Sequence, residues 1–459
     1  LVSLGYGTAE WPAFVLSAGI TMGVGISCLL LFYTTHVQLT HRDGFLVVAL
    51  TWLLTSVFGA IPFYLLGVAP TWAAAFFEAT SGLTTTGGTV LVGLNDMGQG
   101  VLFWRMWLHW LGGLGIIVLA VALLPFLKVG GLQFFRAELP RLDQHQLQER
   151  VQSVTRILWT VYLTITLYCI LGFYLGGMGW FDAICHAMSV VSTGGFANYD
   201  QSFGYFNSPA LELVACVGMV LGASNFVLHF SALRQRSFQP YQRNPEMMML
   251  ARVLVITITL FSLILWTTGT YPTWLESLRH AAFSTISVMT STGLTNPDYS
   301  TWPVLLPMSL LLLMLVGSCT GSTCGGMKLL RVMILIQQGA RELRRMLHPH
   351  GVIPVKIGAT LVPSDVLHGV ASFAALFLMS YVVSGLILAA NGLDLVSAFT
   401  AAAAALTNTG PGLGPVVGPA GNYAGVGAFN QVVLAITMLV GRLEILAFWV
   451  VFLPQFWRR

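Results

Sequence analysis

Thr84-Thr85-Thr86-Gly87 is the first of four short turns that decide the predicted fold. The other three are Val191-Ser192-Thr193-Gly194, Thr290-Ser291-Thr292-Gly293 and Thr407-Asn408-Thr409-Gly410. Every turn ends in Thr-Gly and has a small polar side chain two residues before the glycine. The glycines are separated by 107, 99 and 117 residues. Four copies at this quasi-regular spacing indicate an internal fourfold repeat.

The composition of the chain excludes a soluble globular protein. Of the 459 residues, 56% are hydrophobic and 8% are charged, whereas soluble domains carry about 25% charged residues. The mean hydropathy is +0.78. So few charges cannot supply a polar surface for a chain of this length, and the sequence therefore predicts an integral membrane protein.

Long apolar runs cover most of the chain, and each is long enough to cross a bilayer as a helix. A β-barrel is excluded because the strict alternation of its strands is absent. The expected spans are 11–33, 44–67, 101–127, 154–176, 209–232, 250–269, 303–336 with an interruption, 366–390 and 428–454.

The basic residues fix the expected orientation. They gather in three connections, 128–156, 234–252 and 331–356, whereas the connections on the opposite side hold a single one, Arg279. By the positive-inside rule the basic side is cytoplasmic, and so is the C-terminus. Nine spans would then put Leu1 outside. Because the chain also begins without Met, we expect a further first span to precede it.

The four turns lie in the connections on the outer side, each after a short helix. The short helices are expected near 72–84, 180–191, 274–290 and 395–407. The sequence thus predicts an all-α integral membrane protein of four pseudo-symmetric span–pore loop–span repeats around a central pore, plus an N-terminal helix. The expected units are a peripheral region at 1–40 and repeats at 41–150, 151–245, 246–350 and 351–459.

The chemistry of the turns favours a monovalent cation. Non-helical backbone at membrane depth is tolerated where it lines a cavity or is buried in protein. Carbonyl and hydroxyl oxygens from four turns could replace the water around an alkali ion. The turns contain neither carboxylates, which a divalent-cation filter uses, nor basic residues, which an anion pore uses. The alternative is that they are re-entrant helix caps in a transporter with its cation site elsewhere.

The seventh span is interrupted at 317–326, where four glycines and six Ser, Thr or Cys residues cannot form a stable helix. We expect this stretch to face the pore as a mobile gate, or alternatively to be a close helix contact through small residues. The gate residues expected from this interpretation are Gly317, Ser318, Thr320, Gly321, Gly325 and Gly326, with Lys328 and Arg442.

Lys328 and Arg442 are costly charges within spans, and such charges are usually functional. Arg442 is expected to hold the gate through carbonyl contacts and to form an electrostatic barrier, or alternatively to pair with a carboxylate or helix end. Glu444 is two residues away on another helix face and should not neutralise it. Lys328 could instead extend to the cytoplasmic interface. Glu78, Asp182 and Glu276 are candidates for concentrating cations at the mouth, or ordinary helix-start charges.

Further segments are specific for one family. They are Asp43-Gly44-Phe45, Gly112-Gly113-Leu114-Gly115-Ile116-Ile117, 317–328, Gly441-Arg442-Leu443-Glu444 and Phe456-Trp457-Arg458-Arg459. Together with the four turns, they resemble the Trk/Ktr/HKT potassium-transporter superfamily over residues 40–459.

The resemblance implies potassium entry across the bacterial inner membrane, with filter glycines at Gly87, Gly194, Gly293 and Gly410. One glycine per turn should select less sharply than a longer filter, so some passage of sodium, rubidium or caesium is expected. The resemblance also implies a homodimer and a cytosolic ring of nucleotide-binding regulatory subunits.

The competing function is a secondary transporter that couples potassium entry to sodium or protons, which usually needs midplane carboxylates that are few here. No arrangement of paired carboxylates, metal ligands or nucleophile and base rises above chance, so we expect no enzyme. We also expect no covalently bound cofactor and no nucleic-acid partner.

Overall fold

The computed structural model describes residues 1–33, 41–123 and 144–457. These residues are mostly helical, and the strands among them form one small hairpin of β1 (Lys356–Ile357) and β2 (Thr360–Leu361). The predicted helical membrane fold is therefore confirmed. Most of the basic connection predicted at 128–156, and the terminal Arg458-Arg459, lie outside the residues whose structure and burial are described.

Four units of the same construction follow one another along the chain. Each has a long first helix, a short helix, one of the four turns and a second helix. The first helices are α3 (His41–Leu65), α7 (Gln144–Leu175), α12 (Pro245–Thr267) and α16 (Ser364–Ala390). The short helices are α4 (Trp72–Leu83), α8 (Trp180–Val191), α13 (Trp274–Met289) and α17 (Leu395–Leu406). The second helices are α5 (Gln99–Leu123), α9 (Pro209–Ala223), α14 (Leu305–Val316) and α18 (Ala428–Arg442).

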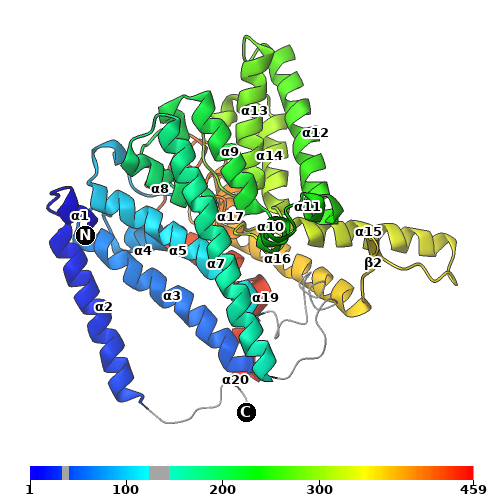
Figure 1. The fold of residues 1–459 in the computed structure, drawn as a ribbon, viewed down its shortest axis with the longest axis horizontal. Coiled ribbons are helices and arrows are strands. Elements are labelled where there is room, and N and C mark those ends of the chain that lie inside the picture. Colours follow the sequence, from blue (N-terminus) through cyan, green and yellow to red (C-terminus); the bar gives the residue numbers. More distant parts are fainter. Residues whose placement is uncertain (34–40, 124–143, 458–459) are drawn as a thin grey trace.

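Two helices extend from this body on opposite sides (Figure 1). Helix α2 (Trp11–Leu31) runs along one edge of the molecule, and α15 (Leu329–Leu347) projects from the other. The remaining helices are short connections: α1 (Val2–Gly5), η1 (Leu94–Asp96), η2 (Ser202–Phe206), α11 (Gln239–Arg243), η3 (Tyr299–Thr301) and α20 (Pro454–Trp457).

The outward faces of the long helices are apolar. Among the described residues, five helices are long and apolar enough to cross a membrane, or up to seven if each bent pair is one span. Only 6% of the apolar window of α2 and 28% of that of α12 are buried inside the protein. Apolar surface of this extent is stable where lipid covers it. The chain is thus a multi-pass membrane protein.

Two of the second helices, α9 and α18, break partway, which the hydropathy pattern did not predict. Helix α9 continues as α10 (Phe226–Gln235) after a bend of 100°, and α18 continues as α19 (Ile445–Val451) after one of 112°. The predictions of continuous spans at 209–232 and 428–454 are therefore wrong. At the first break, the Asn225 side chain accepts a hydrogen bond from the Val227 amide and starts a new helix. At the second, Glu444 takes a left-handed conformation.

The short helices lie inside the protein, and three of the four begin with a side-chain cap. Thr71, Thr273 and Asp394 each accept a hydrogen bond from the third residue after them and so begin α4, α13 and α17. Nearly all of α4 and α17 is buried. The C-terminal ends of the short helices, where the helix dipole is negative, lead directly into the four turns.

The N-terminal helix is attached to the first unit by Glu10. Its carboxylate accepts hydrogen bonds from the Gly100 amide at 2.8 Å and the Thr8 hydroxyl at 3.0 Å. Gly100 lies in the first turn of α5, where amides have no partner within the helix. Glu10 therefore caps α5 and connects α2 to it.

Candidate ion pathway

The four turns share one backbone conformation. Each short helix is followed, two residues after its end, by a residue in the left-handed region, and then by a glycine with positive φ two residues further on. The first set is Thr85, Thr193, Ser291 and Asn408, with φ of 53°, 51°, 49° and 53°. The glycines are Gly87, Gly195, Gly293 and Gly410, with φ of 83°, 92°, 73° and 95°.

This conformation changes the register of the second turn by one residue. In the second turn the amide of Gly194 donates to Ser189 O at 2.8 Å, as the Thr86 amide donates to Ser81 O in the first turn. Gly194 therefore matches Thr86, and Gly195 matches Gly87. The sequence pattern aligned Gly194 with Gly87, Gly293 and Gly410, whereas the structure places Gly195 at that position. Val191 is the last residue of α8 and lies before the turn.

The turns form a closed ring. A Cβ added to any of the four glycines would collide with a carbonyl oxygen of the next turn. The pairs are Gly87 with Gly194 O, Gly195 with Thr292 O, Gly293 with Thr409 O, and Gly410 with Thr86 O. The ring closes from the fourth turn to the first, so the glycines gather at one place. Glycine is required here both for positive φ and for this close approach.

A second layer of close contacts supports the ring from the second helices. The carbonyl oxygen that ends each short helix meets a small residue of its own unit. Gly112, Gly222 and Gly441 lie against the carbonyls of Leu83, Val191 and Leu406. In the third unit the Ser318 hydroxyl donates to Met289 O at 2.8 Å. A close contact to this carbonyl thus occurs in all four units, from a glycine of the second helix in three of them and from Ser318, just after the second helix, in the third unit.

Threonine hydroxyls brace three of the turns. In each, the hydroxyls of the first and third residue hydrogen-bond with each other. The pairs are Thr84–Thr86, Thr290–Thr292 and Thr407–Thr409, with oxygens 2.8, 2.7 and 2.9 Å apart. In the second turn Gly194 has no hydroxyl, and Ser192 keeps only bonds to backbone carbonyls of α8, Met188 O and Ser189 O. The second turn thus differs from the others in its side chains but not in its backbone.

A cavity of about 320 Å³ opens on one side of the ring. It is lined by the residues that follow the turns, among them Gly88, Phe196, Asp200 and Tyr423. The Tyr423 hydroxyl donates to Gly410 O at 2.7 Å, and the Tyr423 amide donates to Thr89 O at 2.8 Å. One tyrosine thereby joins the fourth turn to the segment after the first.

Loop 317–326 lies on the other side of the ring. The Thr193 hydroxyl donates to the Thr323 hydroxyl at 3.0 Å, and the Gly325 amide donates to the Ser291 hydroxyl at 2.9 Å. A Cβ on Gly325 would collide with Thr407 O. The loop therefore contacts three of the four turns directly. It is not helical, as predicted, and lies against the ring rather than only against neighbouring helices.

Comparison with known proteins agrees with this architecture. The TrkH family profile, described as "Cation transport protein", matches residues 12–459. The chain belongs to the TrkH family. It is 41% identical to the Trk system potassium uptake protein TrkH of Halomonas elongata, over 100% of this chain and 95% of that protein. It is 36% identical to TrkG of Escherichia coli, over 93% and 88%.

A solved structure shows the same fold. The crystal structure of the potassium transporter TrkH from Vibrio parahaemolyticus superposes with a TM-score of 0.92 at 37% identity, covering 100% of this chain and 94% of that one. The resemblance drawn from the turns and the interrupted span is thus confirmed. The family is one of transport proteins and not of enzymes.

The two charges singled out in this TrkH-family protein both contact loop 317–326. Arg442 is 3% exposed, and its Nη1 donates to Thr323 O. Lys328 is 8% exposed, and its Nζ donates to Cys324 O at 2.6 Å. Lys328 therefore does not extend to an interface. Glu444 pairs with Arg331 and not with Arg442. This outcome was expected, but not through spacing on one helix, since α18 ends at Arg442 and Glu444 lies at the break.

Glu246 is a site residue that sequence reasoning missed. Its Oε1 accepts hydrogen bonds from the Thr320 amide at 2.8 Å, the Thr320 hydroxyl at 3.0 Å and the Leu330 amide at 3.1 Å. It thus joins the loop to the start of α15. In the sequence, Glu246 reads as an ordinary acidic residue in the first turn of a helix. The signal that could have identified it is the rarity of charged residues in this chain, which makes an acidic residue at the start of a span worth noting.

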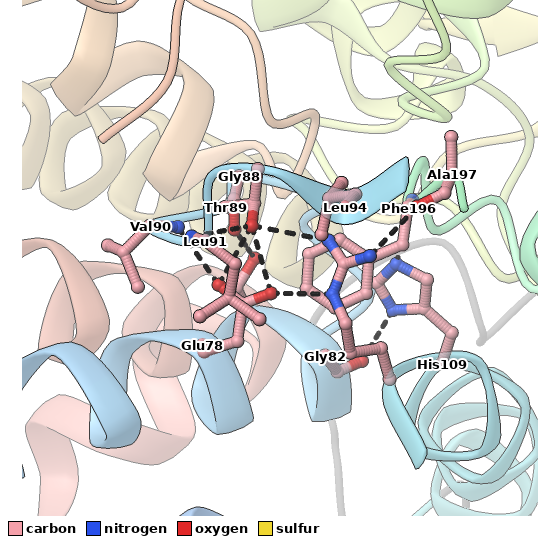
Figure 2. A network of polar contacts seen from close by, with 12 residues as sticks. Glu78, Gly82, Gly88, Thr89, Val90, Leu91, Leu94, His109, Phe196 and Ala197 are labelled. Carbon is pink, nitrogen blue, oxygen red and sulfur yellow. Dashed lines mark hydrogen bonds and ion pairs between the residues drawn. The ribbon is translucent and has the colours of Figure 1, made fainter. Parts of the chain in front are cut away.

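Glu78 does not face the mouth as a free carboxylate. It is fully buried, and its Oε1 lies 2.8 Å from Nε of Arg105. The Thr89 hydroxyl and the Val90 amide also donate to it, as Figure 2 shows. The prediction that Glu78 concentrates cations is therefore wrong, because Arg105 neutralises its charge. Asp200, which lines the cavity, remains an exposed carboxylate there.

Proposed function

We propose that this protein takes up potassium through the ring of the four turns. The observation that carries the proposal is the ring itself. Each of its four carbonyl oxygens, of Thr86, Gly194, Thr292 and Thr409, lies at the point where two turns meet. Carbonyls in such a ring can replace the hydration shell of an alkali ion. The relatives matched over the whole chain are named potassium uptake proteins.

The proposed filter consists of the turns in their structural register. Its residues are Thr84 to Gly87, Ser192 to Gly195, Thr290 to Gly293 and Thr407 to Gly410. The cavity beside Gly88 and Phe196 is its vestibule, where Asp200 attracts cations. A short ring of this kind discriminates weakly, so rubidium, caesium and some sodium are expected to pass as well as potassium.

The proposed gate is loop 317–326 with Lys328 and Arg442. It lies across the pathway directly below the ring, since it contacts three turns. Its contacts to Arg442 and Glu246 are the ones that opening must change. Its glycines allow other backbone conformations, because Gly317, Gly321 and Gly326 already have positive φ.

The proposed setting is the bacterial inner membrane, with the C-terminus and α15 on the cytoplasmic side. Each of the units 41–150, 151–245, 246–350 and 351–459 supplies one quarter of the pathway, with 1–40 at the periphery. From the resemblance, the proposal includes a homodimer and a cytosolic nucleotide-binding ring that controls the gate.

Reconstitution into liposomes tests the proposal. Potassium-loaded vesicles that contain the protein should take up more radioactive rubidium than protein-free vesicles. Planar bilayers that contain the protein should show unitary potassium currents that follow the electrochemical gradient. Absence of uptake and of currents would overturn potassium transport. A fixed stoichiometry of potassium with protons or sodium would overturn the channel mechanism in favour of coupled transport.

A further inference from the structure

The second turn of the ring lacks a side chain that the other three turns have. Thr86, Thr292 and Thr409 stand at one position of the ring, and Gly194 stands at the equivalent position. Gly194 has no positive φ that would require glycine. The local backbone therefore does not explain this glycine, and the reason must be a neighbour.

That neighbour is the imidazole of His109. A Cβ on Gly194 would lie 2.6 Å from Cγ and 2.8 Å from Nε2 of His109. His109 comes from α5 of the first unit and is fully buried. Its ring therefore fills the space that a threonine side chain fills in the other turns.

His109 also makes two hydrogen bonds that join the first and second units. Its Nδ1 lies 2.6 Å from Gly82 O near the end of α4, and its Nε2 lies 3.1 Å from the Phe196 amide just after the second turn. The amide can only donate and the carbonyl can only accept. Figure 2 shows both bonds, and together they require the neutral tautomer with hydrogen on Nδ1.

The Glu78–Arg105 pair holds the same segment after the second turn through Arg105. Nη1 of Arg105 donates to Ala197 O at 2.8 Å, and its guanidinium lies 4.1 Å from the centre of the Phe196 ring. The other face of that ring stacks with His109, with centroids 4.1 Å apart. The Phe196 ring is thus held between the guanidinium of Arg105 and the imidazole of His109, and both side chains come from α5.

We propose that His109 is a positioning residue for ion selectivity, which replaces the missing threonine brace of the second turn. It touches no ion. It sets the position of the Gly194 carbonyl relative to the first turn through Gly82 and Phe196. The inference rests on the proposed function of the ring as a filter, and it adds the residue that makes the second quarter of the ring equivalent to the others.

A double-mutant cycle tests the inference, because threonine and imidazole compete for one space. Gly194→Thr alone should clash with His109 and abolish flux. His109→Ala alone should keep flux but lower the potassium-to-sodium permeability ratio by about fivefold, the order expected for lost positioning hydrogen bonds. His109→Ala with Gly194→Thr should regain flux and much of the ratio, since it rebuilds the threonine arrangement with Ser192 as hydroxyl partner.

Reversal potentials in potassium and sodium gradients give the ratio, and thermal unfolding in detergent gives stability. Arg279→Gln is the matched structural control, because it breaks an ion pair with Glu212 between α13 and α9 outside the ring. It should lower the unfolding temperature without changing the ratio. His109→Gln, which keeps a donor and an acceptor, provides a second variant should His109→Ala fail to fold.

The outcomes separate the inference from the function on which it rests. An unchanged ratio in His109→Ala would overturn the inference while wild-type potassium flux persists. So would a fivefold lower ratio in His109→Gln, which keeps both hydrogen-bonding groups. A double variant no better than Gly194→Thr would also overturn it. Absence of selective flux in the wild type would instead overturn the proposed function.

Discussion

Nη1 of Arg442 donates a hydrogen bond to the carbonyl oxygen of Thr323 at 2.7 Å. The residues are 119 positions apart, and they connect the break of the last second helix to loop 317–326. Nη2 of Arg442 lies 3.4 Å from Gly112 O in α5. One guanidinium therefore joins the loop to both the fourth and the first unit.

Replacing Arg442 with alanine should release the loop and raise potassium flux without any cytosolic partner. A hydrogen bond to a charged group contributes about 1.5–3 kcal/mol, so we expect flux to rise by about tenfold or more. Rubidium uptake into liposomes measures it. Arg442→Lys keeps the charge and one donor but loses the planar fork, and its flux should fall between the two. Equal flux in all three proteins would contradict this role.

Glu246 should hold the loop from the opposite side. Glu246→Ala removes three hydrogen bonds to Thr320 and Leu330 and should raise flux, whereas Glu246→Gln keeps an acceptor oxygen and should raise it less. Asp365→Asn is the matched control, because Asp365 is an exposed acid in the first turn of α16. Flux that rises equally in Glu246→Ala and Asp365→Asn would show that the loss of a charge at a helix start, and not the loss of the hydrogen bonds from Glu246 to the loop, is responsible.

The ring should not tolerate a single added methyl group. Gly87→Ala places a Cβ against Gly194 O and should abolish potassium flux while the protein still reaches the membrane. Gly93→Ala is the control for backbone strain alone, since Gly93 also has positive φ, of 75°, but has nothing within 4 Å of an added Cβ. It should cost about 1 kcal/mol of stability and leave flux intact. Flux that survives in Gly87→Ala would mean that ions do not pass through the ring.

The buried Glu78–Arg105 pair should matter for stability far more than an exposed pair. Glu78→Gln leaves the Arg105 charge buried without its partner, and breaking such pairs costs about 3–5 kcal/mol. The unfolding temperature in detergent should therefore fall strongly. In the control pair, a hydrogen bond from Arg341 lowers the pKa of the Glu342 carboxyl, but the group is exposed, so Glu342→Gln should change the unfolding temperature little.

The sequence revealed those parts of the pathway that have a composition of their own. The four turns and loop 317–326 stand out because Thr, Ser and Gly interrupt apolar runs. The register of the second turn did not stand out, because Gly194 and Gly195 are the same residue type and differ only in φ. Nor could the breaks after Ala223 and Arg442 be predicted, since the segments on both sides are apolar.

Partners distant in the chain were also beyond sequence reasoning. Glu78 and Arg105 lie 27 residues apart on different helices, and the folded contact alone shows that one neutralises the other. The two hydrogen bonds of His109 likewise join segments 27 and 87 residues away in the sequence. Glu444 does not pair with Arg442, as expected, but the helical spacing behind that expectation does not apply, because α18 ends at Arg442 and Glu444 lies at the break.

Cys324 offers a direct measure of whether the loop moves. The residue is 3% exposed in loop 317–326, and Lys328 donates a hydrogen bond to its carbonyl. If Arg442 and Glu246 hold the loop closed, a membrane-permeant maleimide should react with Cys324 about tenfold faster in Arg442→Ala than in the wild type, following the same free energy that governs flux. Peptide mass spectrometry reads each cysteine separately. Exposed Cys28 should react equally in both proteins, and a rise in flux without faster labelling of Cys324 would place the gate elsewhere in the chain.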